Sequence, residues 1–150
     1  MQPGPDTAQR RDWIAVLARA EADAIAAGLG QIADLPRWSV LRGPESGLVM
    51  VRGRAGGGGG AFNLGEMTVT RCTVRIAGGE VGHAYVAGRD PRRAELAAAA
   101  DALMQNAELR GAVEQSVIAP LARAQHARRQ AVAAKAAATR VQFFTMRTMR

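Results

Sequence analysis

The stretch FNLGEMTVTRCTVRI, residues 62–76, places the strongest constraint on the fold of this chain because it reads as one long β-strand. Side chains along a strand point alternately to its two faces. One face would carry Thr68, Thr70, Cys72, Val74 and Ile76, and the other Met67, Val69, Arg71, Thr73 and Arg75. The first face is apolar enough to lie on a core. The second begins apolar and then places two arginines beside a threonine, so we expect it to face something other than the chain's own core.

The composition limits the core that such a strand can join. The chain has 150 residues, and 48% of them are hydrophobic, but only 4% are aromatic and many of the rest are alanine. Alanine buries little area, so a single domain spanning residues 1–150 has a thin core of its own. This composition suits a subunit that completes its burial against a partner, because obligate interfaces resemble a domain core cut in half.

The flanking sequence predicts an α+β domain. An antiparallel sheet of about four strands carries an N-terminal helix and two C-terminal alanine-rich helices, packed mainly on one face. Short connections with glycine turns favour antiparallel pairing. The expected elements are a helix over 7–27, strands at 38–41, 48–53, 66–76 and 80–87, a helix from 91, and a helix over 113–139.

Several local signals support these elements. Trp13, Leu17, Ala20 and Ala24 recur at helical spacing in the first helix, and Gly28 is placed to end it. Gly-Pro-Glu-Ser-Gly, residues 43–47, has the composition of a turn between two strands.

Other signals concern the second strand and the C-terminal helices. Residues 48–51 are apolar on both faces, which is typical of a strand covered on both sides. Asp90 followed by Pro91 is a strong helix start, and Leu96, Ala99, Ala100, Leu103 and Met104 give that helix an apolar stripe. Pro120 is expected either to kink the last helix or to open its second half.

Positive charge is concentrated at the C-terminal end. Of the 20 basic residues, seven follow Gln115, where no acidic residue occurs: Arg123, Arg128, Arg129, Lys135, Arg140, Arg147 and Arg150. Such a segment suits nucleic acid, an anionic substrate or an acidic protein surface. No aromatic residue interleaves with the basic ones before Phe143, and no known nucleic-acid-binding pattern accompanies them. A helix face that docks on a partner is therefore favoured, and a small basic nucleic-acid-binding module is the alternative.

The glycine run in RGRAGGGGG, residues 52–60, resembles a phosphate-binding loop only superficially. A Walker-type loop needs a lysine and a hydroxyl, and a dinucleotide-binding loop should open a helix, whereas this run leads into a strand. A flexible hairpin loop is the preferred interpretation. Arg52 and Arg54 beside it remain candidates for anion contact.

No set of residues forms a recognisable active site. Cys72 lies on the face opposite Arg71 and Arg75, so we interpret it as a packing residue, and a single cysteine permits no intrachain disulfide. His83 shares a strand face with Tyr85 and is interpreted as a partly buried structural histidine; His126 is expected to be exposed. Paired-carboxylate, HxH and HExxH motifs are absent, so no catalytic residue and no metal ligand is predicted.

The expected location is cytoplasmic. No apolar run approaches the ~20 residues of a membrane span, and the N-terminal sequence shows no apolar stretch of a signal peptide.

Four blocks of the sequence carry a resemblance to a known family. RGPESGLVMVRGRAG (42–56), FNLGEMTVTRCTVRI (62–76), VGHAYVAGRD (81–90) and KAAATRVQFFTM (135–146) closely resemble the PhnG family, a subunit of the bacterial carbon–phosphorus lyase system. The similarity runs in order over nearly the whole chain. Two local departures are the plain run of five glycines and the RTMR ending, which lacks a short acidic finish.

The resemblance implies a non-catalytic or accessory role in organic phosphonate catabolism. Members of the family assemble with PhnH, PhnI and PhnJ, and PhnI is the expected direct partner. With PhnI, PhnH and PhnL, the subunit is needed to displace adenine from ATP with methylphosphonate, which gives ribose 1-methylphosphonate 5-triphosphate. The resemblance implies no cofactor on this chain, because ATP and methylphosphonate are substrates of the complex.

The sequence also names candidate interface residues. The C-terminal segment 139–150 combines basic and large apolar side chains, so we expect it to dock on a partner. The residues predicted to contact a partner or an anion are Arg52, Arg54, Met67, Val69, Arg71, Thr73, Arg75, Arg140, Phe143 and Phe144.

Overall fold

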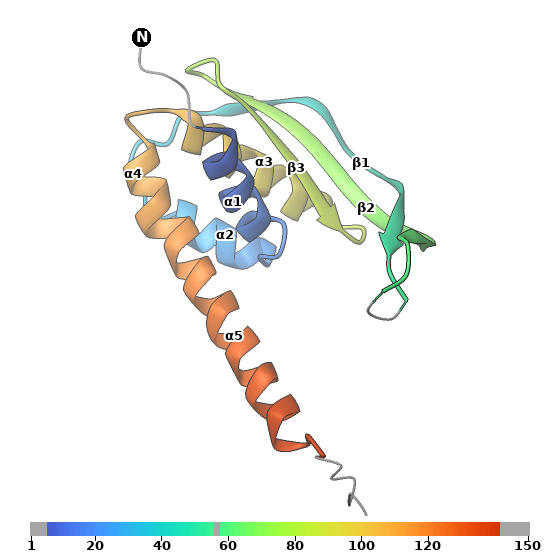
Figure 1. Ribbon diagram of the computed structural model, residues 1–150. Coiled ribbons are helices and arrows are strands. Elements are labelled where there is room, and N and C mark those ends of the chain that lie inside the picture. The colour runs from blue at the N-terminus through green and yellow to red at the C-terminus, as the bar shows by residue number, and fades with distance from the viewer. Residues whose placement is uncertain (1–5, 56–57, 142–150) are drawn as a thin grey trace, which may run out of the picture.

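The structure is a computed structural model that describes residues 6–55 and 58–141. It is an α+β fold in which three antiparallel strands, in the order β1-β2-β3, carry the helices on one face (Figure 1). The elements are α1 (Thr7–Leu17), α2 (Ala22–Leu29), β1 (Trp38–Gly53), β2 (Phe62–Ile76), β3 (Val81–Ala87), α3 (Pro91–Gln105), α4 (Arg110–Val113), the π-helical turn η1 (Glu114–Ile118) and α5 (Ala119–Ala138). The predicted fold class is confirmed.

The sheet has three strands where about four were predicted, because residues 38–53 form one long strand. Gly43-Pro44-Glu45 interrupts the register of β1 against β2 without reversing the chain. Gly43 has a φ of +73°, a conformation that favours glycine, so the turn-forming composition produces a bulge here. Pairing of β1 resumes at Glu45 opposite Arg71 and continues along the strand.

The predicted helix over 7–27 is two helices. Helix α1 ends at Leu17, and Glu21 adopts an extended conformation before α2. This break lets Trp13, Leu17 and Ala20 remain buried while α2 turns to bury a different set, Ile25, Gly28 and Leu29. Ala24, predicted to continue the apolar stripe of α1, is therefore exposed.

The two faces of β2 differ as predicted. Thr70, Cys72, Val74 and Ile76 are buried beneath the helices. Helix α3 lies directly under this face, and its close approach to β3 depends on Gly82, where a β-carbon would overlap the Ala98 carbonyl. The sheet covers α3 on one side and α1, α2 and α4 pack on it from the other, so α3 is buried over much more than a single stripe, from Ala97 to Met104.

A buried carboxylate connects the helices to the sheet through hydrogen bonds. The side chain of Asp101 in α3 is 0% exposed and accepts four hydrogen bonds. Arg10 of α1 donates through Nη2 at 2.7 Å and Nε at 3.2 Å, and Trp13 donates through Nε1 at 2.8 Å. The backbone N–H of His83 in β3 donates at 2.9 Å. This Asp101 network joins α1, α3 and β3 at one point.

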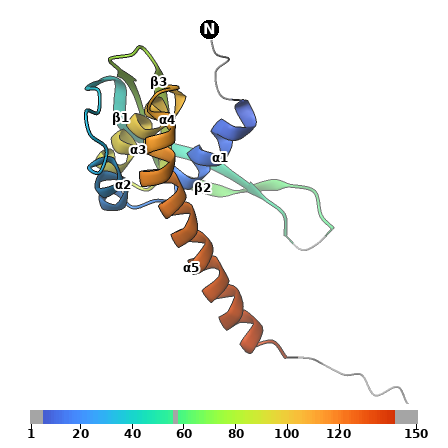
Figure 2. The same ribbon diagram turned by 90° about the vertical axis from the view of Figure 1, so that its left-hand side faces the viewer.

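The C-terminal helix begins at the predicted break. Asp90 caps α3 by accepting from the Arg93 N–H at 2.9 Å, with Pro91 at the helix start, and Pro120 opens α5 after the π-helical turn. Leu121 is buried, but from His126 onward the described part of α5 is exposed and extends away from the body (Figure 2). Within the part of the chain that the structure describes, no helix is long and apolar enough to span a membrane.

Candidate functional site

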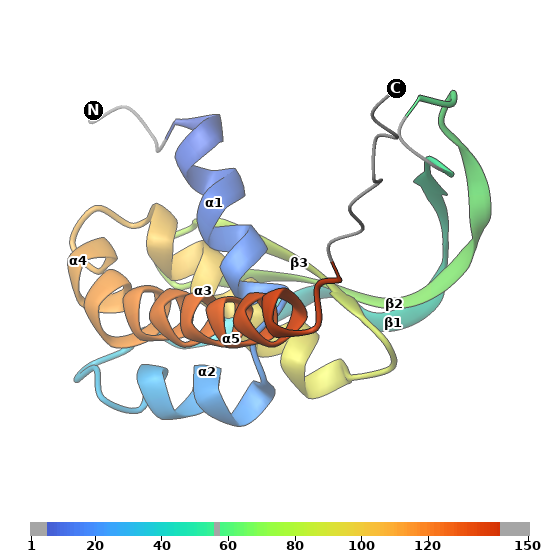
Figure 3. The same ribbon diagram turned by 60° about the horizontal axis from the view of Figure 1, so that its bottom comes forward.

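The candidate site is the outer face of the sheet, defined as the face opposite the helices. The strand register assigns these side chains to it: Ser39, Arg42 and Glu45 of β1; Met67, Val69, Arg71, Thr73 and Arg75 of β2; and Val81, His83 and Tyr85 of β3. No described helix covers this face, and the sheet curves strongly along it (Figure 3). It is therefore the part of the fold that offers functional groups to other molecules.

Two arginines share one carboxylate at the centre of the outer face. Glu45 Oε1 accepts from Nε of Arg42 at 2.8 Å and from Nε of Arg71 at 2.7 Å. These hydrogen bonds, that of Arg42 first, lower the pKa of the Glu45 carboxyl below its ordinary value, so Glu45 stays ionised to lower pH. Arg71 also lies beside Tyr85, and hydrogen bonds with Tyr85 and with Glu45 raise the pKa of its guanidinium.

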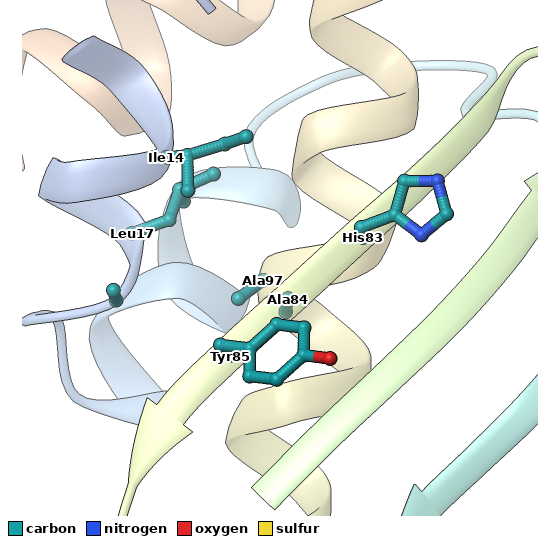
Figure 4. A pocket seen from close by; sticks show the side chains of 7 residues that line it. Ile14, Leu17, His83, Ala84, Tyr85 and Ala97 are labelled. Carbon is teal, nitrogen blue, oxygen red and sulfur yellow. The ribbon is translucent and has the colours of Figure 1, made fainter. Parts of the chain in front are cut away.

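His83 and Tyr85 complete the polar part of the outer face. In Figure 4 both rings extend from β3 toward β2, whereas Ile14 and Leu17 approach β3 from the helical side. The Nδ1 atom of His83 lies 3.1 Å from Oγ1 of Thr73. His83 is exposed, which corrects its interpretation as a partly buried residue: its even-numbered neighbours face the core, and it therefore faces out.

Two cavities border β3, one on the helical side of the sheet and one on the outer face. The gap in Figure 4 between α1, β3 and α3 has a volume of about 10 Å³, enough for roughly one water molecule. On the outer face, a cavity of about 200 Å³ is lined by Arg42, Arg71, Cys72, Thr73, His83 and Tyr85. Of these two cavities, the outer one has room for a chemical group of a ligand.

The outer face continues into a projecting hairpin arm, which we define as residues 47–53 of β1 and 62–67 of β2. The arm extends past the helices as a two-stranded ribbon (Figures 2 and 3). Large apolar side chains on it are exposed, including Leu48 at 61%, Leu64 at 57% and Met50 at 53%. Residues 48–51 were predicted to be covered on both sides. Within the described chain they are not, because no helix reaches this end of the sheet.

The predicted contact residues occupy different environments. Met67 and Arg75 are exposed on the outer face, Arg71 and Thr73 are half-buried there, and Val69 is buried within the chain itself. The remaining residues lie elsewhere: Arg52 and Arg54 are exposed on and beside the arm, and Arg140 is exposed after α5, whereas Phe143 and Phe144 lie outside the described residues.

Sequence reasoning missed Arg42 and Glu45. Both were assigned to a connection between strands, so their positions opposite Thr73 and Arg71 were not expected. The alternation within β2 identified Arg71, but nothing in the local sequence specified its partner across the bulge.

Cys72 is a buried packing residue. It is 2% exposed on the core face of β2, and burial raises the pKa of its thiol, which disfavours the reactive thiolate. Among residues 6–55 and 58–141, no group of three or more His, Cys, Asp or Glu side chains gathers where it could hold a metal ion.

Comparison with known proteins identifies the family. The family model described as phosphonate metabolism protein PhnG matches residues 8–148. A protein of Rhizobium meliloti (strain 1021), named alpha-D-ribose 1-methylphosphonate 5-triphosphate synthase subunit PhnG, is 50% identical over 139 residues, which cover 93% of this chain and 88% of that protein. The match includes both strands of the hairpin arm and all three strands of the outer face. The chain therefore belongs to the PhnG family of phosphonate metabolism proteins.

Proposed function

We propose that this chain is an accessory subunit of a ribose 1-methylphosphonate 5-triphosphate synthase in organic phosphonate catabolism. The name of the Rhizobium meliloti relative supports the assignment, since that protein is a subunit of such an enzyme. The enzyme as a whole transfers the ribose-triphosphate part of ATP to methylphosphonate and displaces adenine. This chain supplies no catalytic residue and no cofactor, and ATP and methylphosphonate are substrates of the complex.

The observation that carries the proposal is the uncovered arm together with the outer face. Monomeric proteins rarely expose contiguous large apolar patches, and such patches mark interaction sites. Leu48, Met50, Phe62, Leu64 and Met67 are all exposed on the arm. A partner subunit would bury them. The register places Leu48 and Met50 opposite Thr68 and Glu66, on the helix side of the ribbon, and Met67 on the outer face, so such a partner would contact both faces of the arm.

PhnI is the proposed direct partner, with PhnH and PhnJ in the same core complex and PhnL acting with it. The assembly would be cytoplasmic. The C-terminal segment 139–150 is a second proposed contact: Arg140 and Val141 are exposed at its start, and the sequence beyond contains Phe143, Phe144 and Met146. Burial of each large apolar side chain would contribute about 1.5–3 kcal/mol.

An affinity tag on this chain, expressed within its own operon, tests the proposal. We expect PhnI, PhnH and PhnJ to co-purify at fixed stoichiometry, and we expect the purified single chain to show no turnover of ATP. A chain that purifies alone and binds RNA with a steep dependence on salt would instead support a nucleic-acid-binding module. Turnover of ATP by the single chain, abolished by substitution of one of its own residues, would exclude the accessory role.

Substitution of Cys72 separates packing from chemistry. Cys72→Ser places a hydroxyl in the core and is expected to cost about 1–3 kcal/mol of unfolding free energy, whereas Cys72→Ala avoids this cost. Both variants should support growth on methylphosphonate as the phosphorus source once the complex has assembled. A complex that assembles at normal yield with either variant, yet does not support growth, would contradict the packing role.

A further inference from the structure

We propose that the outer face contains a binding site for a phosphoryl or phosphonyl group, formed by Arg42, Arg71, His83 and Tyr85. We call these four residues the cradle. They line the outer-face cavity of about 200 Å³. The inference rests on the proposed function for its ligand class, because the product named for the relative contains both a phosphonate and a triphosphate. The geometry of the site itself does not depend on that name.

Arg42 and Arg71 keep hydrogen-bond donors that Glu45 does not use. Each guanidinium has five N–H groups, and Arg42 and Arg71 each bond Glu45 through Nε. Among the described residues, the Nη groups of Arg42 form no hydrogen bond, and Arg71 adds only the contact with Tyr85. Glu45 thus fixes the two side chains by their inner edges. Their outer edges remain available to an oxyanion.

Positive charge predominates on the outer face. Arg42, Arg71 and Arg75 contribute three positive charges to the outer face, and Glu45 is the one acidic residue that the strand register assigns to it. The face therefore keeps an excess of two positive charges with histidine neutral. Arginine pairs bind phosphate through parallel charge-assisted hydrogen bonds, which are stronger than neutral ones.

The donor groups line the cavity from several sides. The four groups come from all three strands, so they surround the cavity from different directions. His83 contacts Thr73 through Nδ1, and among residues 6–55 and 58–141 its Nε2 has no hydrogen-bond partner. The Tyr85 hydroxyl can donate or accept. A tetrahedral oxyanion presents oxygens in several directions and can accept from donors on several sides. The volume of about 200 Å³ is far larger than the single-water gap of about 10 Å³ and leaves room for such a group.

Proton NMR of the full-length chain provides a direct test. The chain contains one tyrosine and two histidines, so the ring signals of Tyr85, His83 and His126 can be assigned simply. Titration with methylphosphonate and with inorganic triphosphate should shift the signals of Tyr85 and His83 along one saturable curve. His126, on the exposed part of α5, is the internal control and should not follow that curve.

Two substitutions should change the affinity in opposite directions. Arg71→Gln removes a donor and should weaken triphosphate binding about 10-fold or more, as expected for a charge-assisted hydrogen bond. Glu45→Gln removes the internal carboxylate and should strengthen binding. If the Arg42–Glu45–Arg71 cluster had a purely structural role, both variants should weaken triphosphate binding. Arg123→Gln on α5 makes the same charge change as Arg71→Gln away from the site and is the matched control.

The possible results separate failure of the cradle from failure of the proposed function. Equal effects of Arg71→Gln and Arg123→Gln would show that triphosphate binds only through net charge and would overturn the cradle. Failure of triphosphate and methylphosphonate to bind the chain and the complex, together with loss of partner subunits in Arg71→Gln, would assign the arginines to a partner carboxylate and would also overturn it. Binding that depends on Arg71, in a chain that assembles with no partner, would support the cradle and reject the accessory-subunit function.

Discussion

A chain in which Asn-Gly replaces residues 51–65 is expected to fold but to lose its partner subunits completely. Met50 and Glu66 are directly paired across β1 and β2, so a two-residue turn can join them. None of the described residues in the removed segment is buried, and the core under the helices stays complete. The shortened chain should therefore keep its circular dichroism spectrum and its cooperative unfolding transition.

Loss of assembly follows from the apolar side chains of the arm. The deletion removes Phe62 and Leu64, and burial of each would contribute about 1.5–3 kcal/mol to association. A combined loss of about 3–6 kcal/mol corresponds to a decrease in affinity of roughly 10²–10⁴-fold. Co-purification with the tagged chain, measured by stoichiometry after size-exclusion chromatography, is the readout.

Two further variants separate apolar contact from charge and from strand pairing. Phe62→Ser with Leu64→Ser keeps the length of the arm and should also prevent co-purification. Arg52→Gln with Arg54→Gln changes charge alone and should mainly alter the dependence of assembly on salt, since rim charges affect association rate more than affinity. Full stoichiometry in the shortened chain would show that the arm is not part of the interface.

Asp101→Ala is expected to remove a large part of the stability of the chain. It leaves the buried N–H of Trp13, the backbone N–H of His83 and the Arg10 guanidinium without their acceptor. Removal of one partner of a buried ion pair costs about 3–5 kcal/mol, against a total of about 5–15 kcal/mol for a typical domain. Urea denaturation followed by circular dichroism should show this loss as a lower midpoint.

Asp12→Ala is the matched control for this prediction. Asp12 lies on α1 next to Trp13, but it is exposed and forms no side-chain hydrogen bond within the described residues. Its substitution should change stability by no more than about 0.5 kcal/mol. Asp101→Asn keeps one acceptor oxygen but directs an NH2 group toward a donor. Its loss of stability should therefore lie between those of Asp12→Ala and Asp101→Ala. A loss below about 1 kcal/mol in Asp101→Ala would show that the network adds little to the fold.

Local signals in the sequence determined several elements of this protein without reference to the rest of the chain. The alternation along β2 assigned Cys72 to the core and Arg71 to the other face, because side-chain direction in a strand depends only on position. Asp90-Pro91 indicated the start of α3, since capping acts within one helical turn. Pro120 was expected either to kink the last helix or to open its second half, and it lies at the start of α5. The four sequence blocks that resemble the PhnG family indicated the family, which the comparisons confirm.

Tertiary structure decided the features that depend on residues far apart in the sequence. Helix α1 stops at Leu17 and not at 27 because α2 must pack on α3 from another direction. Residues 43–47 bulge within β1 because the strand continues to pair with β2, although their composition alone predicts a turn. Glu45 therefore reaches Arg71 across 26 positions of sequence, a pairing that no local pattern specifies. The exposure of Leu48 and Met50 could likewise not be predicted from the sequence. An apolar run indicates that burial is favourable, but it does not show whether residues of the same chain bury it.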